Sequence, residues 1–166
     1  LTVAGHNLQQ VIYWLMGSFN GRGWLHVGII LPHLVIGLVL AVYLARDLNA
    51  LSLGEEAAAT LGVHVEGSKR LLLLASTLLT AGAVSVSGII GFVGLLVPHI
   101  SRLLFGPDHR LLLPASALLG SIFLVIADLL SRIIIANAQL PVGIITSICG
   151  GPFFLYLLRR NQARRF

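Results

Sequence analysis

The composition of this 166-residue chain excludes an ordinary soluble fold. Hydrophobic residues make up 57% of the chain and charged residues 10%, whereas an average globular protein has about 25% charged residues. The mean hydropathy of +0.94 predicts that the few charges lie at the ends of long apolar segments, because a charge inside a bilayer is costly. We therefore expect an all-α polytopic membrane protein with a single membrane domain over residues 1–166.

The formal net charge of +5 does not indicate nucleic-acid binding. Arginines gather directly after the last apolar stretch, so the segment 159–166 is predicted to be a basic cytoplasmic tail. Cys149 is the single cysteine, which allows no intrachain disulfide, and its apolar neighbours predict a buried, unreactive thiol. Because the segment 1–20 lacks the basic start and apolar stretch of a signal peptide, we expect the latter part of a longer protein.

Four stretches without acidic or basic residues are candidates for membrane crossings. A spanning helix needs about 20 residues, and the stretches 23–45, 111–127 and 133–158 each suit one crossing. The stretch 71–101 has 31 residues, which would make one helix of about 46 Å. That length exceeds a hydrocarbon core of about 30 Å.

Glycine and proline in this long stretch predict a break. They are Gly88, Gly91, Gly94 and Pro98. We expect a helix over about 71–87, a tight turn, and a shorter helix over about 92–105. Close packing of two crossings is the favoured role of these residues, and a gating hinge is the alternative.

The distribution of basic residues supports two crossings in this stretch. With the tail inside, two crossings leave only Arg22 and Arg132 outside, whereas one crossing would leave four basic residues outside. The positive-inside rule favours the first arrangement. We therefore predict about five transmembrane helices, a segment 1–22 with a short helix on the outer face, and a cytoplasmic loop over 46–70.

The loop 46–70 contains signals for a short helix. Ser52 and Glu55 have the spacing of a capping box, and Gly62 follows as a stop signal. The alanines at 57–59 provide a small face that another surface could approach. The helix is either a docking element or a capped linker at the membrane interface.

Polar and glycine positions along the whole chain resemble one family. The loop reads LNALSLGEEA at 48–57, and the turn reads GIIGFVGLLVP at 88–98. Further matching segments are 13–18 with Trp24, 61–62, 99–102, 108–110 with Pro114, 127–128 with Arg132, 140–144 and 151–152. The chain is similar to the second half of FecCD-family permeases, the membrane subunits of ATP-binding-cassette (ABC) importers for iron-siderophore, heme and vitamin B12.

The resemblance implies a homodimeric permease with ten helices per subunit and an ATPase partner. In the family, the short loop helix docks into the cytoplasmic ATPase subunit, which implies coupling residues Leu53, Gly54, Glu55, Glu56, Ala57, Ala58, Leu61 and Gly62. ATP and Mg²⁺ would belong to that partner, and no cofactor or metal is expected in this chain. The sequence agrees, since it contains no Gly-x-x-x-x-Gly-Lys-Ser/Thr loop for phosphate.

The resemblance also implies an outer docking surface and a translocation pathway. A periplasmic or lipid-anchored substrate-binding protein would meet Arg132 and, less directly, Arg22. Spacing alone gives Arg132 another role, an i,i+4 ion pair with Asp128. The implied pathway residues are Tyr13, Trp14, Met16, Gly17, Ser18, Pro141 and Gly143.

These expectations define a permease subunit, or a fragment of one, which is not an enzyme. It would carry an iron-siderophore-type metal chelate across the bacterial inner membrane by alternating access, with its C-terminus in the cytoplasm. Vitamin B12 and heme stay open as cargo. The alternatives are an ion-coupled secondary carrier and a membrane scaffold fragment that transports nothing.

Overall fold

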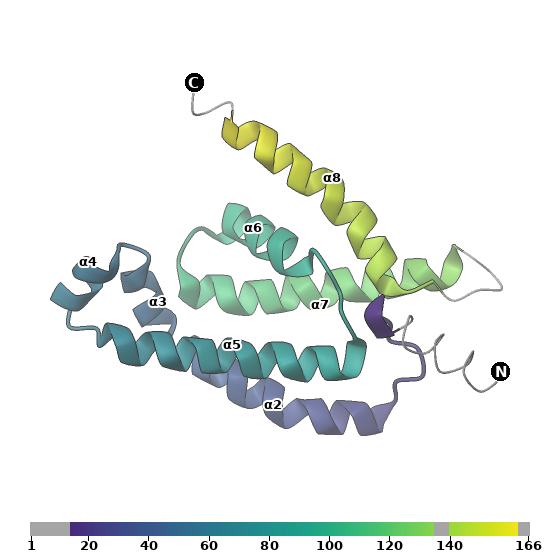
Figure 1. Ribbon diagram of the computed structural model, residues 1–166, viewed down its shortest axis with the longest axis horizontal. Coiled ribbons are helices and arrows are strands. Elements are labelled where there is room, and N and C mark those ends of the chain that lie inside the picture. Colours follow the sequence, from purple (N-terminus) through teal and green to yellow (C-terminus); the bar gives the residue numbers. More distant parts are fainter. Residues whose placement is uncertain (1–13, 135–139, 163–166) are drawn as a thin grey trace. The chain divides into compact units, whose positions relative to one another are not determined.

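The described part of the chain is entirely helical. A computed structural model describes residues 14–134 and 140–162, and within them are seven α-helices and no strands (Figure 1). The helices are α2 (Trp24–Tyr43), α3 (Ala45–Leu51), α4 (Glu55–Thr60), α5 (Val65–Ser87), α6 (Val93–Phe105), α7 (His109–Ile133) and α8 (Val142–Gln162). This confirms the predicted all-α class.

Three helices are long and apolar enough to cross a membrane. They are α2, α5 and α7, with 20, 23 and 25 residues, so the chain is a multi-pass membrane protein. The helix α6 is apolar but has 13 residues, about 20 Å at 1.5 Å per residue. The apolar part of α8 is also shorter, Val142–Leu157. A total of five crossings therefore stays a prediction.

The break in the long apolar stretch is confirmed. α5 ends at Ser87 and α6 begins at Val93. Between them Gly88 has a φ of +72° and Phe92 has a φ of +65°, values that no α-helix contains. α5 begins earlier than predicted, at Val65, so the loop before it is shorter than 46–70.

The chain forms two compact units. Among the described residues, the first unit contains those up to Gly21, Ser87–Ile100 and those from Leu119 onward, and the second contains Arg22–Val86 and Ser101–Leu118. In the second unit α2 and α5 lie side by side (Figure 1). Gly37 permits this approach, because a Cβ atom there would lie 2.5 Å from Cγ of Leu79.

The loop between α2 and α5 contains two short helices, α3 and α4, whereas one was predicted. The predicted capping box of Ser52 and Glu55 is wrong. Ser52 is the C-cap of α3, with φ −66° and ψ −18°, and its hydroxyl donates to the carbonyl oxygen of Asn49 at 2.6 Å. An N-cap residue needs an extended backbone, and Ser52 is helical. Gly54 takes the N-cap position of α4 without any side-chain cap. Gly62 follows the end of α4 with a φ of +83°, as predicted.

Candidate coupling surface and translocation segments

The helix α4 and its flanks present an exposed apolar and acidic surface. The side chains of Leu53 and Leu61 are 70% and 66% exposed, and Glu55 and Glu56 are exposed in the first turn of α4. Two acidic side chains there complement the positive end of the helix dipole. Exposed leucines flank α4 at its two ends in the second unit.

The alanines of α4 differ in exposure, and Ala59 is exposed. Ala58 is fully buried, at 0% exposure, and Ala57 is half-buried. The carbonyl oxygen of Ala58 accepts from the backbone N–H of Val63 at 3.1 Å. Among the predicted coupling residues, Leu53, Gly54, Glu55, Glu56, Leu61 and Gly62 are exposed. Ala58 therefore allows α4 to pack against its own unit, while Ala59 stays accessible.

Polar contacts join α3 and α4 to the start of α5. The Ser68 hydroxyl donates to Oδ2 of Asp47, and Ser68 is buried. Nζ of Lys69 lies 2.5 Å from Oε1 of Glu55. His64 caps α5, since the N–H of Gly67 donates to its Nδ1 at 3.1 Å. This ring therefore has a structural role at a helix start.

A second set of contacts joins α3 to the start of α7. Asn49 donates from Nδ2 to Oδ1 of Asp108 at 2.7 Å. The backbone N–H of His109 donates to Oδ1 of Asn49 at 2.9 Å, and Nδ1 of His109 lies 2.7 Å from the same oxygen. The sequence did not predict this role of Asn49, because its partners are about 60 residues away in the chain. The only local signal was an amide side chain next to leucine and alanine.

Asp108 is the N-cap residue of α7 and is held in its ionised form. The backbone N–H of Arg110 donates to Oδ1 of Asp108 at 3.0 Å. This bond is the main cause that lowers the pKa of the Asp108 carboxyl from its ordinary value of 3.8, and the amide of Asn49 is the second. A charge at this position also matches the helix dipole.

Glycines allow three segments of the first unit to meet at their backbones. The N–H of Ser18 donates to the carbonyl oxygen of Ser87 at 2.8 Å, and the N–H of Gly143 donates to that of Gly17 at 3.4 Å. A Cβ atom at Gly88 would overlap the carbonyl oxygen of Trp14, and one at Gly143 would overlap that of Met16. We call this meeting point of segments 14–18, 87–89 and 141–143 the glycine crossing.

A cavity of about 530 Å³ opens beside the glycine crossing. Its lining residues are Leu15, Met16, Ile89, Gly91, Gly143, Ile144, Ser147 and Ile148. Two predicted pathway residues, Met16 and Gly143, thus line one cavity. Pro141 is buried, Gly17 and Ser18 lie within the crossing, and Trp14 is 42% exposed. Tyr13 lies outside the described residues.

The remaining turn residues differ in their surroundings. Cβ atoms at Gly91 and Gly94 would meet nothing within 4 Å, so neither glycine serves close packing in the described part of the chain. Pro98 lies inside α6. Phe92 adopts a positive φ and packs so closely on Gly150 that a Cβ atom there would overlap its Cβ.

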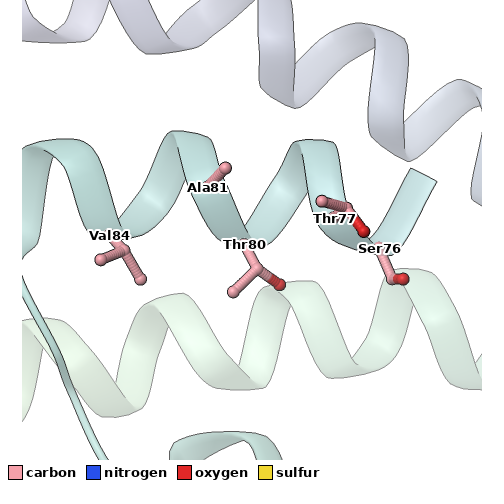
Figure 2. Close-up of a pocket in the computed structure, with 5 residues that line it drawn as sticks. All are labelled: Ser76, Thr77, Thr80, Ala81 and Val84. Carbon is pink, nitrogen blue, oxygen red and sulfur yellow. The ribbon is translucent and has the colours of Figure 1, made fainter. Parts of the chain in front are cut away.

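A second cavity, of about 450 Å³, lies along one side of α5. Figure 2 shows the side chains of Ser76, Thr80 and Val84 pointing to the same side of α5, and Thr77 and Ala81 also line the cavity. The hydroxyls of Ser76 and Thr77 both donate to the carbonyl oxygen of Leu73, at 2.9 and 2.7 Å. Two of the hydroxyls are thus satisfied within the helix.

Each of the two candidate docking arginines, Arg132 and Arg22, contacts a side chain four residues away in the chain. Arg132 donates from Nε to Oδ2 of Asp128 at 2.8 Å, which confirms the i,i+4 pair. Its side chain is 54% exposed, so it stays accessible to a partner. Nη1 of Arg22 lies 3.3 Å from Nε2 of His26.

Titratable side chains do not gather into a metal site in the described ranges. His99 packs edge-on against the ring of Phe153, with centroids 5.6 Å apart. The expectation for Cys149 is wrong, because this residue is exposed. Its neighbour Ile148 is also 65% exposed, so apolar neighbours in the sequence did not imply burial.

Comparison with known proteins identifies the family. A family model described as the FecCD transport family matches residues 1–160. The chain belongs to the FecCD transport family. It is 51% identical over 166 residues to the ABC transporter permease protein YvrB of Bacillus subtilis, a match that covers 99% of this chain and 47% of that protein.

Other FecCD relatives have named cargo. The chain is 51% identical over 161 residues to the cobalamin import system permease protein BtuC of Halobacterium salinarum, covering 97% of this chain and 43% of that protein. It is 46% identical over 162 residues to the hemin transport system permease protein HmuU of Yersinia pestis, a match that covers 95% of this chain and 47% of that protein. The chain thus spans about half the length of these relatives.

A solved structure has the same fold. It is a metal-chelate type ABC transporter in an inward-facing conformation, with a TM-score of 0.85 and 35% identity. The match covers 92% of this chain and 49% of that chain. The helical arrangement described above is therefore that of an ABC transporter membrane subunit.

Proposed function

We propose that this chain forms part of the permease subunit of an ABC importer. The favoured cargo is a metal chelate of the iron-siderophore type, and heme and vitamin B12 stay open as alternatives. The observation that carries the proposal is the pair α3 and α4. Residues around α4 are exposed, and side chains of the pair are bonded to the starts of two helices long enough to span a membrane. A scaffold fragment would need no such element.

The ATPase partner is a separate cytoplasmic chain that holds ATP and Mg²⁺. It docks on the exposed residues around α4, with the apolar contact at Leu53 and Leu61 and the acidic contact at Glu55 and Glu56. Closure of the ATPase dimer moves α4, and the neighbouring helices carry the motion to the glycine crossing by alternating access. This chain itself makes no covalent change to the cargo.

The remaining partners follow from the same proposal. The permease is a homodimer in the bacterial inner membrane with a cytoplasmic C-terminus, and a periplasmic or lipid-anchored binding protein docks at Arg132 and Arg22. Arg132 suits this role because its guanidinium is exposed while Asp128 holds its orientation. The cavity beside Met16 and Gly143 belongs to the pathway.

Co-purification and transport test this proposal. The permease is expressed with an ABC ATPase subunit, and the matched variant lacks residues 53–62. We expect the ATPase to co-purify only with the intact loop and ATP-dependent uptake to require it. Association without loop dependence would refute the coupling surface. Uptake that needs an ion gradient and no ATPase would favour a secondary carrier, and no uptake at all would favour a scaffold.

A further inference from the structure

Asn49 occupies a position between the docking element and a spanning helix. It lies in α3, is half-buried, and reaches Asp108 and His109 at the start of α7. The amide of Asn49 forms hydrogen bonds with Asp108 and His109, and both of these residues lie at the start of α7. We call these contacts the Asn49 bridge.

The chemistry of the partners fixes the orientation of the amide. An ionised carboxylate can only accept hydrogen bonds, so the NH₂ group of Asn49 must face Asp108. Oδ1 of Asn49 then faces His109, where it accepts from the backbone N–H at 2.9 Å. The ring atom Nδ1 of His109, 2.7 Å from that oxygen, must carry its proton to donate there.

The bridge differs from the ion pair that joins α4 to α5, whereas the bond from buried Ser68 to Asp47 joins α3 to α5 through side chains as short as that of Asn49. Glu55 and Lys69 are 63% and 38% exposed, and exposed ion pairs hold two flexible side chains only weakly. In the Asn49 bridge, a short side chain bonds the backbone N–H of the first residue of α7 and its N-cap carboxylate. Few rotatable bonds separate the backbone of α3 from that of α7, so a displacement of one is passed to the other.

We propose that Asn49 is a positioning residue that transmits the movement of the α3–α4 pair to α7. This rests on the proposed function, because it concerns how docking of the ATPase reaches the membrane helices. When α4 is displaced, α3 moves with it, and the bridge carries the start of α7 along. Without the bridge, the ATPase docks and hydrolyses ATP while α7 stays behind.

The test measures cargo transported per ATP hydrolysed by the complete permease, reconstituted with its ATPase and binding protein in liposomes. Asn49→Asp places a carboxylate against Asp108 and breaks that contact of the bridge, while its other oxygen can still accept from His109. Asp108→Asn keeps an acceptor for Asn49 and for Arg110. The double variant restores a complementary pair, because the amide introduced at position 108 can donate to the carboxylate introduced at position 49. Ser52→Ala is the matched control, since its hydroxyl bonds only within α3. Co-purified ATPase and melting temperature are recorded for every variant.

We expect Asn49→Asp to lower the transport-to-hydrolysis ratio about five-fold or more, the usual size of a coupling between sites. Asp108→Asn, the double variant and Ser52→Ala should stay near the wild-type ratio. If Asn49→Asp fails to assemble, Asn49→Ala replaces it, because it removes the bridge without adding charge. A wild-type ratio in an assembled Asn49 variant, or no recovery in the double variant, overturns the inference. A wild-type complex that neither binds the ATPase nor transports refutes the proposed function instead.

Discussion

Gly88 lies so close to Trp14 that a Cβ atom at position 88 would overlap the carbonyl oxygen of Trp14. The same oxygen accepts from the N–H of Ile89 at 3.4 Å and from that of Gly17 at 3.2 Å. Three peptide groups therefore meet where side chains would normally keep them apart. The turn between α5 and α6 depends on glycine for both its backbone angle and its packing.

Replacing Gly88 with alanine should strongly destabilise the first unit. The methyl group must displace the Trp14 carbonyl, and the positive φ is unfavourable for any residue with a Cβ. We expect a loss of about 2–5 kcal/mol, the sum of an overpacking cost and the cost of a left-handed backbone. Thermal unfolding in detergent, followed by tryptophan fluorescence, measures it.

Gly94→Ala is the matched control for this prediction. Gly94 lies in α6, and a Cβ atom there would meet nothing within 4 Å. Alanine is favoured over glycine inside helices by roughly 0.5–1 kcal/mol, so this variant should be neutral or slightly more stable. Equal destabilisation by both variants would mean that lipid or another subunit, rather than the Trp14 carbonyl, fills the space around these glycines.

Gly150 and Phe92 should show a non-additive pair of effects. Phe92 holds a positive φ at the start of α6 while its Cβ occupies the space beside Gly150. Gly150→Ala alone creates a clash, and Phe92→Gly alone loses aromatic packing but relieves the backbone. In the double variant the clash is absent, so we expect a coupling energy of about 1–3 kcal/mol. Melting temperatures of the four proteins give this value, and simple additivity would contradict the contact.

Three residues, Gly88, Ser52 and Asn49, show which features of this structure the sequence could predict. The break at Gly88 was predictable, because length and glycine content both forbid one continuous helix. The Ser52 capping box was wrong because α3 extends to Leu51 and takes Ser52 as its C-cap, and a local pattern cannot tell which of two helices a serine ends or begins. The Asn49 bridge was not predictable, since it joins positions that only tertiary packing brings together.

Gly54→Ala tests the backbone that leads into α4. A Cβ atom at Gly54 would meet nothing within 4 Å, but the residue has φ +108° and ψ +155°, a region essentially restricted to glycine. We expect a loss of about 1–3 kcal/mol from backbone strain alone, seen as faster hydrogen exchange of α3 and α4. Exchange rates unchanged from wild type would contradict this.

Gly62 gives the contrasting case. It follows α4 with a φ of +83°, and asparagine is an accepted substitute at such helix ends. In Gly62→Asn, hydrogen exchange of α3 and α4 should therefore be nearly as slow as in wild type. In Gly54→Asn, it should be as fast as in Gly54→Ala. Equal tolerance of asparagine at both positions would show that a general left-handed turn, rather than the special backbone of Gly54, is required.

Asp108 predicts a loss of stability at acid pH. Its folded pKa lies below the ordinary value of 3.8, because the N–H of Arg110 and the amide of Asn49 donate to the carboxylate. A lowered pKa contributes stability above the unfolded value, and this is lost as the pH falls through the folded pKa. Melting temperature measured from neutral pH to below pH 3.8 should fall less steeply in Asp108→Asn than in wild type. If the melting temperature fell equally steeply with pH in both proteins, Asp108 would not contribute to the loss of stability at acid pH.

Glu55 should matter for docking and hardly for stability. Its 2.5 Å pair with Lys69 is exposed to solvent on both sides, and such pairs contribute about 0–1 kcal/mol. We therefore expect Glu55→Gln to change the melting temperature little and the difference to vanish in high salt, because salt screens exposed charges. A large loss that persists in high salt would mean that the pair holds α4 in place. If stability is preserved, weaker co-purification of the ATPase with Glu55→Gln is attributable to the docking surface itself, because the fold beneath it is unchanged.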